Sequence, residues 1–354
     1  MAEMILPGTY IEVRAEKLIV PGPFAIGNLG IVGTASSGDV GVVYTPANIG
    51  DAREFFGAAD AFSPTAKTLV RALELAFGSG AQRVFAVRVA DAGDAGAYTD
   101  GLAALENQDV HIIVVAGQGT GLAAALRAHV ENASTDINKR ERIGVIGSDP
   151  SATVPDLVAP DQTDGRLVFV GPGIKAIDSA SGDEVTLPGS YAAAAVAGRI
   201  ASLDPHVSPT NKTINVNGLE TNFNGTQLEQ LVTSRVLALE SRAGAVRIVR
   251  GITSSTNTAW TQVTTRRIVD YARIGTRAAA NPFIGMLNNT RVRQALKGSI
   301  NSLLADMVER EMLVSYKLDV TATRDEEIRG IARVTMVVRP TFSIDYIRVV
   351  MYLE

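Results

Sequence analysis

The chain has 354 residues, of which 46% are hydrophobic, and carries a formal net charge of −4. It has no cysteine, which excludes disulfides and thiolate metal sites, and its acidic balance gives no electrostatic reason to expect a nucleic-acid partner. The apolar runs are too short to span a bilayer and residues 1–7 lack the features of a secretory signal, so we expect a soluble cytosolic protein without direct membrane insertion.

The first element along the chain is a short extended run near the N-terminus. It consists of Thr9, Tyr10, Ile11, Glu12 and Val13. Pro21-Gly22-Pro23 separates this run from the next apolar segment. Chain ends are usually polar and frayed, and an apolar end that pairs with nothing is an aggregation hazard. We therefore expect residues 1–22 to form an extended arm whose strand adds to a neighbouring subunit's sheet.

Residues 23–255 alternate short β-prone runs with helical ones. Strands are expected at 31–34, 83–89, 110–116, 142–147, 167–170 and 246–250, and helices at 65–77, 98–105, 121–132, 191–203 and 228–236. Ser181-Gly182-Asp183 is typical of a hairpin turn, and the alanine-rich helix at 191–203 is expected to pack closely. This alternation predicts a doubly wound, mostly parallel α/β domain with helices on both faces of the sheet.

Two glycine-rich turns are partly similar in sequence to nucleotide-binding loops. In Gly117-Gln118-Gly119-Thr120-Gly121 the next residue is Leu122, where a dinucleotide fingerprint needs its third glycine. After residues 33–38, Asp39 stands in the place of the lysine that would meet a phosphate. The three histidines, His111, His129 and His206, have no metal-ligand spacing. We expect no catalytic residue, no metal site and no cofactor, with a nucleotide-dependent enzyme on a Rossmann-like domain as the alternative.

The composition changes in residues 256–354, which we expect to form a smaller α+β domain. Residues 266–297 contain seven basic side chains and one acidic side chain, Asp270. Such a run is most often a solvated helix face, and the functional alternative is a docking stripe for an acidic partner. The candidate docking residues are Arg273, Arg277, Arg291, Arg293 and Lys297.

A long helix beginning near Thr290 and two alternating runs, 313–321 and 331–338, follow the basic stretch. The last run, 343–354, is again strand-like. Its apolar face consists of Ile347, Val349, Met351 and Leu353. We expect this strand, like that of the N-terminal arm, to pair with a neighbouring subunit, which indicates a subunit of a polymer.

These segments together resemble the sheath protein of contractile phage tails and tail-like particles. The resemblance is carried by residues 7–12 (PGTYIE), 31–35 (IVGTA), 80–89 (GAQRVFAVRV), 188–199 (PGSYAAAAVAGR), 257–267 (NTAWTQVTTRR), 339–342 (RPTF) and 345–347 (DYI). One departure stands at Arg250-Gly251-Ile252-Thr253, where the family often has an arginine after the glycine. The length, without extra outer domains, is most similar to R-type pyocins and extracellular contractile injection systems.

The resemblance implies a structural subunit rather than an enzyme. Copies would stack as six-fold rings around an inner tube protein, with terminal strands exchanged between subunits, and would contract to drive the tube through a target envelope. Baseplate and terminal cap proteins would be further partners. Assembly would occur in the cytoplasm, before the sheath becomes part of a phage tail-like particle that is released from the cell. Another phage tail structural protein, such as a tube, is an alternative that the helical content disfavours.

Overall fold

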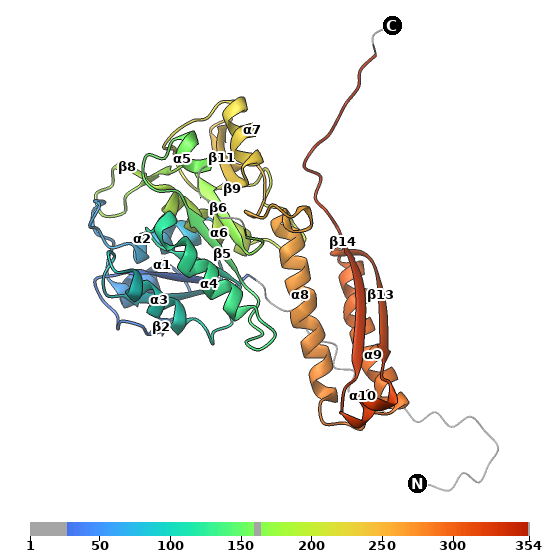
Figure 1. Ribbon diagram of the computed structural model, residues 1–354. Helices are drawn as coiled ribbons and strands as arrows, with labels where there is room; N and C mark the ends of the chain where they lie inside the picture. Colours follow the sequence, from blue (N-terminus) through green and yellow to red (C-terminus); the bar gives the residue numbers. More distant parts are fainter. Residues whose placement is uncertain (1–26, 159–163, 353–354) are drawn as a thin grey trace, which may run out of the picture.

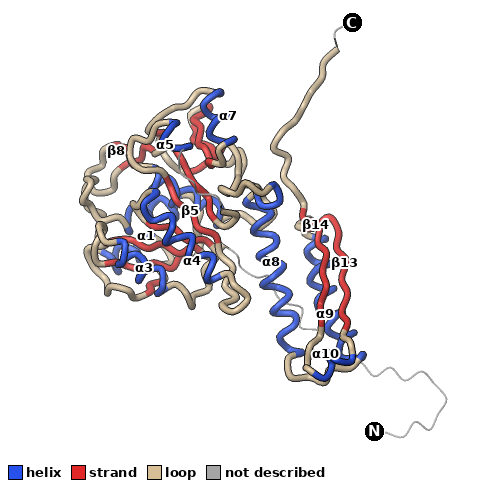
Figure 2. Tube along the Cα trace, in the orientation of Figure 1, coloured by secondary structure: helices blue, strands red, loops and turns tan. Residues whose placement is uncertain are grey.

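The computed structural model describes residues 27–158 and 164–352 (Figure 1). The arm at 1–22, which contains Thr9–Val13, and the terminal Leu353 lie outside the described residues. A large α/β domain stands beside a small α+β domain, and an extended segment leaves the small domain (Figure 2). The expected fold class is confirmed, while the exchange of terminal strands stays a prediction.

A nine-stranded sheet forms the centre of the large domain, in the order β2-β3-β1-β4-β5-β6-β11-β12-β9. The strands are β1 (Leu29–Thr34), β2 (Val43–Tyr44), β3 (Val84–Val89), β4 (Ile112–Val115), β5 (Ile143–Gly147), β6 (Leu167–Gly171), β9 (Thr213–Ile214), β11 (Val236–Arg242) and β12 (Ala245–Ile248). The six strands from β3 to β11 run parallel, and β2, β12 and β9 pair antiparallel at the two edges. The central strands are buried on both faces, which explains their nearly continuous apolar sequence.

Helices cover both faces of this sheet (Figures 1 and 2). One face carries α1 (Ile49–Phe56), α2 (Leu69–Gly78) and α6 (Gly189–Ala201), and the other carries α3 (Ala95–Ala104), α4 (Ala123–Ala133), α5 (Val154–Val158) and α7 (Gly225–Thr233). Leu73 and Ala194 belong to the core of the first face, and Tyr98 and Leu126 belong to that of the second. This is the doubly wound arrangement that the alternating sequence predicts.

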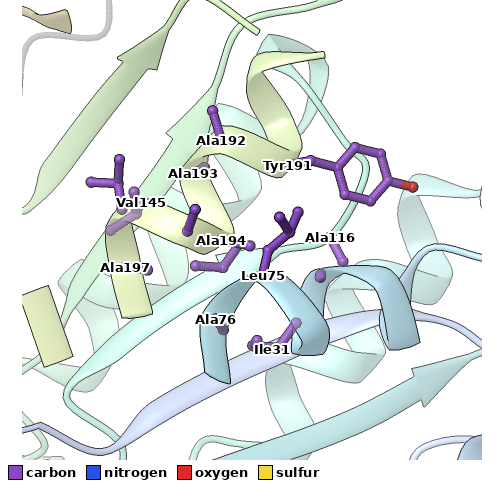
Figure 3. Packing of buried hydrophobic residues seen from close by; sticks show 14 of the residues in the cluster. Ile31, Leu75, Ala76, Ala116, Val145, Tyr191, Ala192, Ala193, Ala194 and Ala197 are labelled. Atoms are coloured by element: carbon purple, nitrogen blue, oxygen red, sulfur yellow. The ribbon is translucent and has the colours of Figure 1, made fainter. Parts of the chain in front are cut away.

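The alanine-rich α6 packs closely against both α2 and the sheet (Figure 3). A Cβ atom built on Gly198 of α6 would lie 2.3 Å from the carbonyl oxygen of Ala76 in α2. At the end of β5, a Cβ atom on Gly147 would lie 1.8 Å from the carbonyl oxygen of Gly189. Small residues therefore allow the three backbones to approach, as the sequence of this helix predicted.

A three-stranded antiparallel sheet, β10-β7-β8, extends the large domain. Its strands are β7 (Ile174–Ile177), β8 (Glu184–Leu187) and β10 (Gly218–Leu219). The β7–β8 turn contains Gly182 with a φ of 79°, so the predicted hairpin turn is confirmed. The buried Asp178 beside this turn accepts a hydrogen bond of 2.7 Å from Arg71, which ties the small sheet to α2.

The small domain consists of two long helices and a hairpin. Its elements are α8 (Val263–Ala280), α9 (Thr290–Glu309), β13 (Leu313–Thr321), α10 (Arg324–Ile328) and β14 (Arg333–Pro340). The described residues also include the short 3₁₀ helices η1 (Thr120–Leu122), η2 (Thr258–Trp260) and η3 (Asn281–Phe283). Ile268 of α8 and Ile300, Leu304 and Met307 of α9 lie in a core of their own. The α9 helix begins at Thr290 because the Asn289 side chain accepts a hydrogen bond from the Val292 backbone.

Two expected elements differ from the structure. The helix expected at 228–236 ends at Thr233, because Arg235 has a φ of 67°, which a helix cannot continue, and β11 begins at Val236. Residues 343–352 are extended but pair with no strand within the described chain. The sheet of the small domain therefore has two strands, β13 and β14.

Candidate assembly site

The usual ligand crevice of an α/β sheet is closed in this protein. Ligands of open α/β sheets bind at the carboxyl ends of the strands, where the strand order reverses. Here that position lies between β1 and β4, and Thr68 fills it. The Thr68 hydroxyl lies 3.3 Å from the Thr34 hydroxyl, and a Cβ atom built on Gly117 would lie 2.4 Å from Thr68 Cγ2. The Thr68 side chain thus contacts the carboxyl ends of both strands.

The glycine-rich turn after β4 faces a carboxylate. A Cβ atom built on Gly119 would lie 1.9 Å from Asp149 Oδ1, and the Thr120 hydroxyl donates a hydrogen bond of 2.5 Å to Asp149 Oδ2. Beside them lies a cavity of about 210 Å³ whose lining includes both Asp149 and Asp156. Acidic side chains repel a phosphate, so the arrangement does not support the enzyme alternative.

Among residues 27–158 and 164–352, no group of three histidine, aspartate or glutamate side chains could hold a metal ion. No helix in the same ranges is long and apolar enough to cross a membrane.

The basic side chains of α8 face the large domain. Arg277 forms a two-point ion pair with Glu141, with a hydrogen bond of 2.7 Å from Nη1 to Oε2. Arg273 pairs with the same carboxylate at 3.2 Å and with Asp136 at 2.8 Å. Arg273 and Arg277 therefore contact acidic groups of their own chain, and their role toward another protein stays a prediction.

Asp270, the one acidic residue of the basic stretch, forms a buried pair across the domain junction. Arg166 donates two hydrogen bonds to its carboxylate, at 2.9 and 3.0 Å, and the two side chains are about one-tenth exposed. Arg267 donates to the backbone carbonyls of Leu203 and Asp204, just beyond the end of α6. The sequence reasoning missed Arg166 and Glu141, although a lone acid among seven bases was a sign of a specific partner.

The other three candidate docking residues lie on α9. Arg293 bonds to Glu327 of α10 at 2.9 Å and is 12% exposed, so it joins elements within the small domain. Lys297 lies 3.3 Å from the exposed Asp319 carboxylate of β13. Arg291 is exposed at the beginning of the helix. These cations are therefore not grouped with Arg273 and Arg277 on one surface that faces the large domain.

The predicted C-terminal strand residues are highly exposed in the segment that follows β14. Ile347, Val349 and Met351 are 83%, 77% and 80% exposed. On the opposite face, Tyr352 is 86% exposed. This segment runs away from the hairpin in Figure 1. An apolar segment of this length without a cover is a surface for a partner.

Two histidines of the large domain have lowered pKa values; His111 is buried, and His129 is half-buried. Burial lowers the pKa of His111 to about 4, although the nearby Asp109 carboxylate opposes that shift. Burial and the neighbouring Arg142 guanidinium lower the pKa of His129 to about 4. His129 Nε2 lies 3.0 Å from Arg142 Nη1, so the neutral ring can accept a hydrogen bond that a protonated ring cannot.

Comparison with known proteins gives the family. The phage tail sheath protein central domain matches residues 92–254, and the phage tail sheath C-terminal domain matches residues 255–354. The chain belongs to the phage tail sheath protein family, as the sequence resemblance predicted.

Curated relatives are longer than this chain. The tail sheath protein of Bacillus phage SP01 is 26% identical over 229 residues, which is 62% of this chain and 39% of the relative. The tail sheath protein of Mycobacterium phage Bxz1 is 26% identical over 315 residues, which is 84% of this chain and 53% of the relative. The chain thus spans about half or less of the length of these relatives.

Solved structures share the fold over nearly the whole chain. The helical sheath of the anti-feeding prophage in its contracted state has a TM-score of 0.78 and 16% identity, covering 99% of this chain and 100% of that chain. The PVC sheath complex of an extracellular contractile injection system, also contracted, has a TM-score of 0.76 and 14% identity, covering 100% and 99%. The sheath tail protein of Desulfitobacterium hafniense has a TM-score of 0.70 and 14% identity, covering 94% and 100%.

Replacement of Asp270 by alanine is expected to destabilise the protein strongly. The change leaves the Arg166 guanidinium buried without its partner, which costs about 3–5 kcal/mol. Asp319→Ala is the matched control, because it removes an exposed pair with Lys297 that contributes under about 1 kcal/mol. The free energy of unfolding from urea titration measures both. If both variants lost the same free energy of unfolding, the pair between Arg166 and Asp270 would not hold the two domains together.

Acid is expected to destabilise the protein through His111 and His129. Both have folded pKa values of about 4 against an ordinary value of 6.5, so the unfolded chain binds more protons between these pH values. The free energy of unfolding therefore falls as the pH is lowered from 7 toward 4, by about 1–2 kcal/mol per histidine at pH 5. His129→Gln should show a smaller difference between urea titrations at pH 7.5 and pH 5.0. A difference as large as that of the unsubstituted protein would contradict this assignment.

Proposed function

We propose that this chain is the structural subunit of a contractile sheath. Copies polymerise as stacked six-fold rings around an inner tube, and contraction drives the tube through a target envelope. The observation that carries the proposal is the exposed apolar segment 346–352, which follows a two-stranded sheet with free edges, in a member of the tail sheath family. Baseplate and cap proteins complete the particle, which is assembled in the cytoplasm and then released. No catalytic step and no cofactor enter this proposal.

Strand exchange supplies the bonds between subunits in this proposal. In the described chain, β13 and β14 pair only with each other, so each has one edge free for another strand. Residues 346–352 of a neighbour, added at such an edge, gain main-chain hydrogen bonds and cover their apolar side chains. The strand of the N-terminal arm, Thr9–Val13, takes another free edge. These bonds persist while the bodies of the subunits rotate.

The free energy of contraction comes from new contacts between large domains. Burial of roughly a few hundred Å² of additional apolar surface per subunit gives several kcal/mol at ~25 cal/mol per Å². The same gain is repeated in every subunit of the sheath, so the total is large without a nucleotide. The connector around residues 16–23 transmits the resulting strain from one ring to the next.

Val349→Lys tests the proposed exchange. Val349 is 77% exposed in the isolated subunit, so a lysine there should leave the thermal unfolding of the monomer unchanged. In the assembly the same side chain is covered, and an uncompensated charge there costs a few kcal/mol, so tubes should not form. Negative-stain micrographs and size-exclusion chromatography measure assembly.

Ile137→Lys is the control for this experiment, because Ile137 is 88% exposed on the large domain and lies outside the proposed strand. It should assemble like the unsubstituted protein. Normal tubes from Val349→Lys would overturn the exchange, and a lowered unfolding temperature of its monomer would show that the segment belongs to the subunit's own core.

We further propose that α9 contacts an acidic inner tube. Arg291 and Lys297 carry this contact: Arg291 is exposed, and Lys297 is partly exposed beside the exposed Asp319 carboxylate, whereas Arg273 and Arg277 bind Asp136 and Glu141 between the two domains. Such contacts are weak and screened, at roughly 0–1 kcal/mol each, which suits a sheath that must release its tube.

The double charge reversal Arg291→Glu with Lys297→Glu should prevent assembly on the tube but not assembly into empty sheaths. Arg140→Glu with Arg242→Glu, two exposed positions on the large domain, is the charge-matched control. Co-sedimentation with purified tube at low and high salt measures the difference, since screening weakens such contacts. If the Arg291→Glu, Lys297→Glu variant still formed extended sheaths on the tube, these two side chains would be only solvated surface residues.

A further inference from the structure

Three sequence motifs that the proposed function leaves unexplained meet at one point. Arg250, just beyond β12, donates a hydrogen bond of 2.8 Å from Nε to Asp345 Oδ2. Gln262, the residue before α8, donates to the same oxygen at 3.1 Å. The Arg250 guanidinium also lies over the Tyr346 ring, 5.3 Å from its centroid. We call Arg250, Gln262, Asp345 and Tyr346 the tail clamp.

The tail clamp holds backbone as well as side chains. The Ser343 backbone donates to Gln262 Oε1 at 3.2 Å, and Gln262 Nε2 donates back to the Ser343 carbonyl at 3.4 Å. Thr210 of the large domain lies 3.4 Å from Asp345 Oδ1. The Asp345 side chain is 6% exposed, whereas Ile347 is 83% exposed. The segment is thus bound tightly where it begins and is uncovered immediately beyond.

The tail clamp lies where the chain could otherwise reverse direction. Main-chain pairing of the hairpin continues to Thr341, whose amide donates to the Met312 carbonyl at 3.0 Å. Residues 341–345 would make a five-residue loop, a length that hairpins commonly use. Residues 346–352 could then lie antiparallel to the free edge of β14 and cover that edge themselves.

Such self-pairing would compete with exchange between subunits. A strand tethered by a short loop has an effective concentration in the millimolar range, above that of free subunits. An unrestrained segment would therefore close onto its own sheet before it met a neighbour. Proteins that exchange strands need a feature that disfavours the intramolecular alternative.

We propose that the tail clamp prevents residues 346–352 from pairing with β14 of their own subunit. It does so by binding Ser343 and Asp345 to the large domain and to the start of α8, which directs the segment away from the hairpin. The segment then remains available to a second copy of the chain. The identity of that partner rests on the proposed function, whereas the block on self-pairing does not.

Hydrogen exchange of the monomer tests the tail clamp directly. In freshly purified protein, the amides of residues 346–352 should exchange at the rate of an open chain. In Asp345→Ala they should exchange about tenfold or more slowly, because the released segment pairs with β14. The same variant should form no tubes. Asp319→Ala removes another carboxylate of the small domain, and it should leave both the exchange rate and assembly unchanged.

A second pair of variants keeps the result interpretable. Arg250→Gln weakens the tail clamp while Asp345 is retained, and it should show the same protection if Asp345→Ala fails to fold. Asp345→Ala combined with Val349→Pro should lose the protection, since proline cannot complete a strand ladder. Open-chain exchange in both clamp variants, or normal tubes from either, would overturn the proposal. If the unsubstituted protein formed no tubes, the proposed function would fail while the exchange result still decided the role of the clamp.

Discussion

The buried pair between Arg166 and Asp270 determines how the two domains are held. It joins the loop before β6 to the middle of α8, and Arg277 with Glu141 extends the same junction along the helix. Buried ion pairs add little net stability, because desolvation offsets their attraction, but they are costly to break. The junction therefore fixes the orientation of the two domains relative to each other more than it adds to the free energy of unfolding. The direction of the β13–β14 hairpin, and of the segment that leaves it, follows from that orientation.

An unpaired sheet edge exposes a monomer to aggregation, whereas in a polymer the same edge can pair with a strand of the next subunit. The subunit has its core inside the large domain and between α8 and α9, so it can fold before it assembles. What it leaves unsatisfied is main chain at the hairpin edges and apolar surface on residues 346–352. In the proposed strand exchange, one added strand would satisfy both at once without weakening the fold of each subunit.

Local patterns in the sequence predicted the fold well. The unbroken apolar run of β4, the glycine in the β7–β8 turn and the alanine-rich α6 each have a short-range signature that the structure repeats. The end of α7 was misplaced because a single left-handed residue, Arg235, decides it. Family membership also followed from the sequence, since motifs along nearly the whole chain occur in family order.

The side-chain partners could not be predicted in the same way. Glu141 and Arg277 are far apart in the chain, and nothing in either local sequence indicates the other. A basic stretch looks the same whether its charges face solvent, a partner or the chain's own carboxylates. The contacts of Asp345 could not be predicted either, because they depend on how the two domains pack together rather than on any local pattern.

Trp260 gives the junction an optical property. It is the only tryptophan in the sequence, and the Arg266 guanidinium lies 3.7 Å from its ring centroid while donating to the Gly165 carbonyl. A stacked cation and a nearby backbone make indole emission sensitive to small displacements. The intrinsic fluorescence of this protein therefore reports on a single place in each subunit, where α8 approaches the sheet. A sheath of many identical subunits would carry the same reporter at every junction, without any added label.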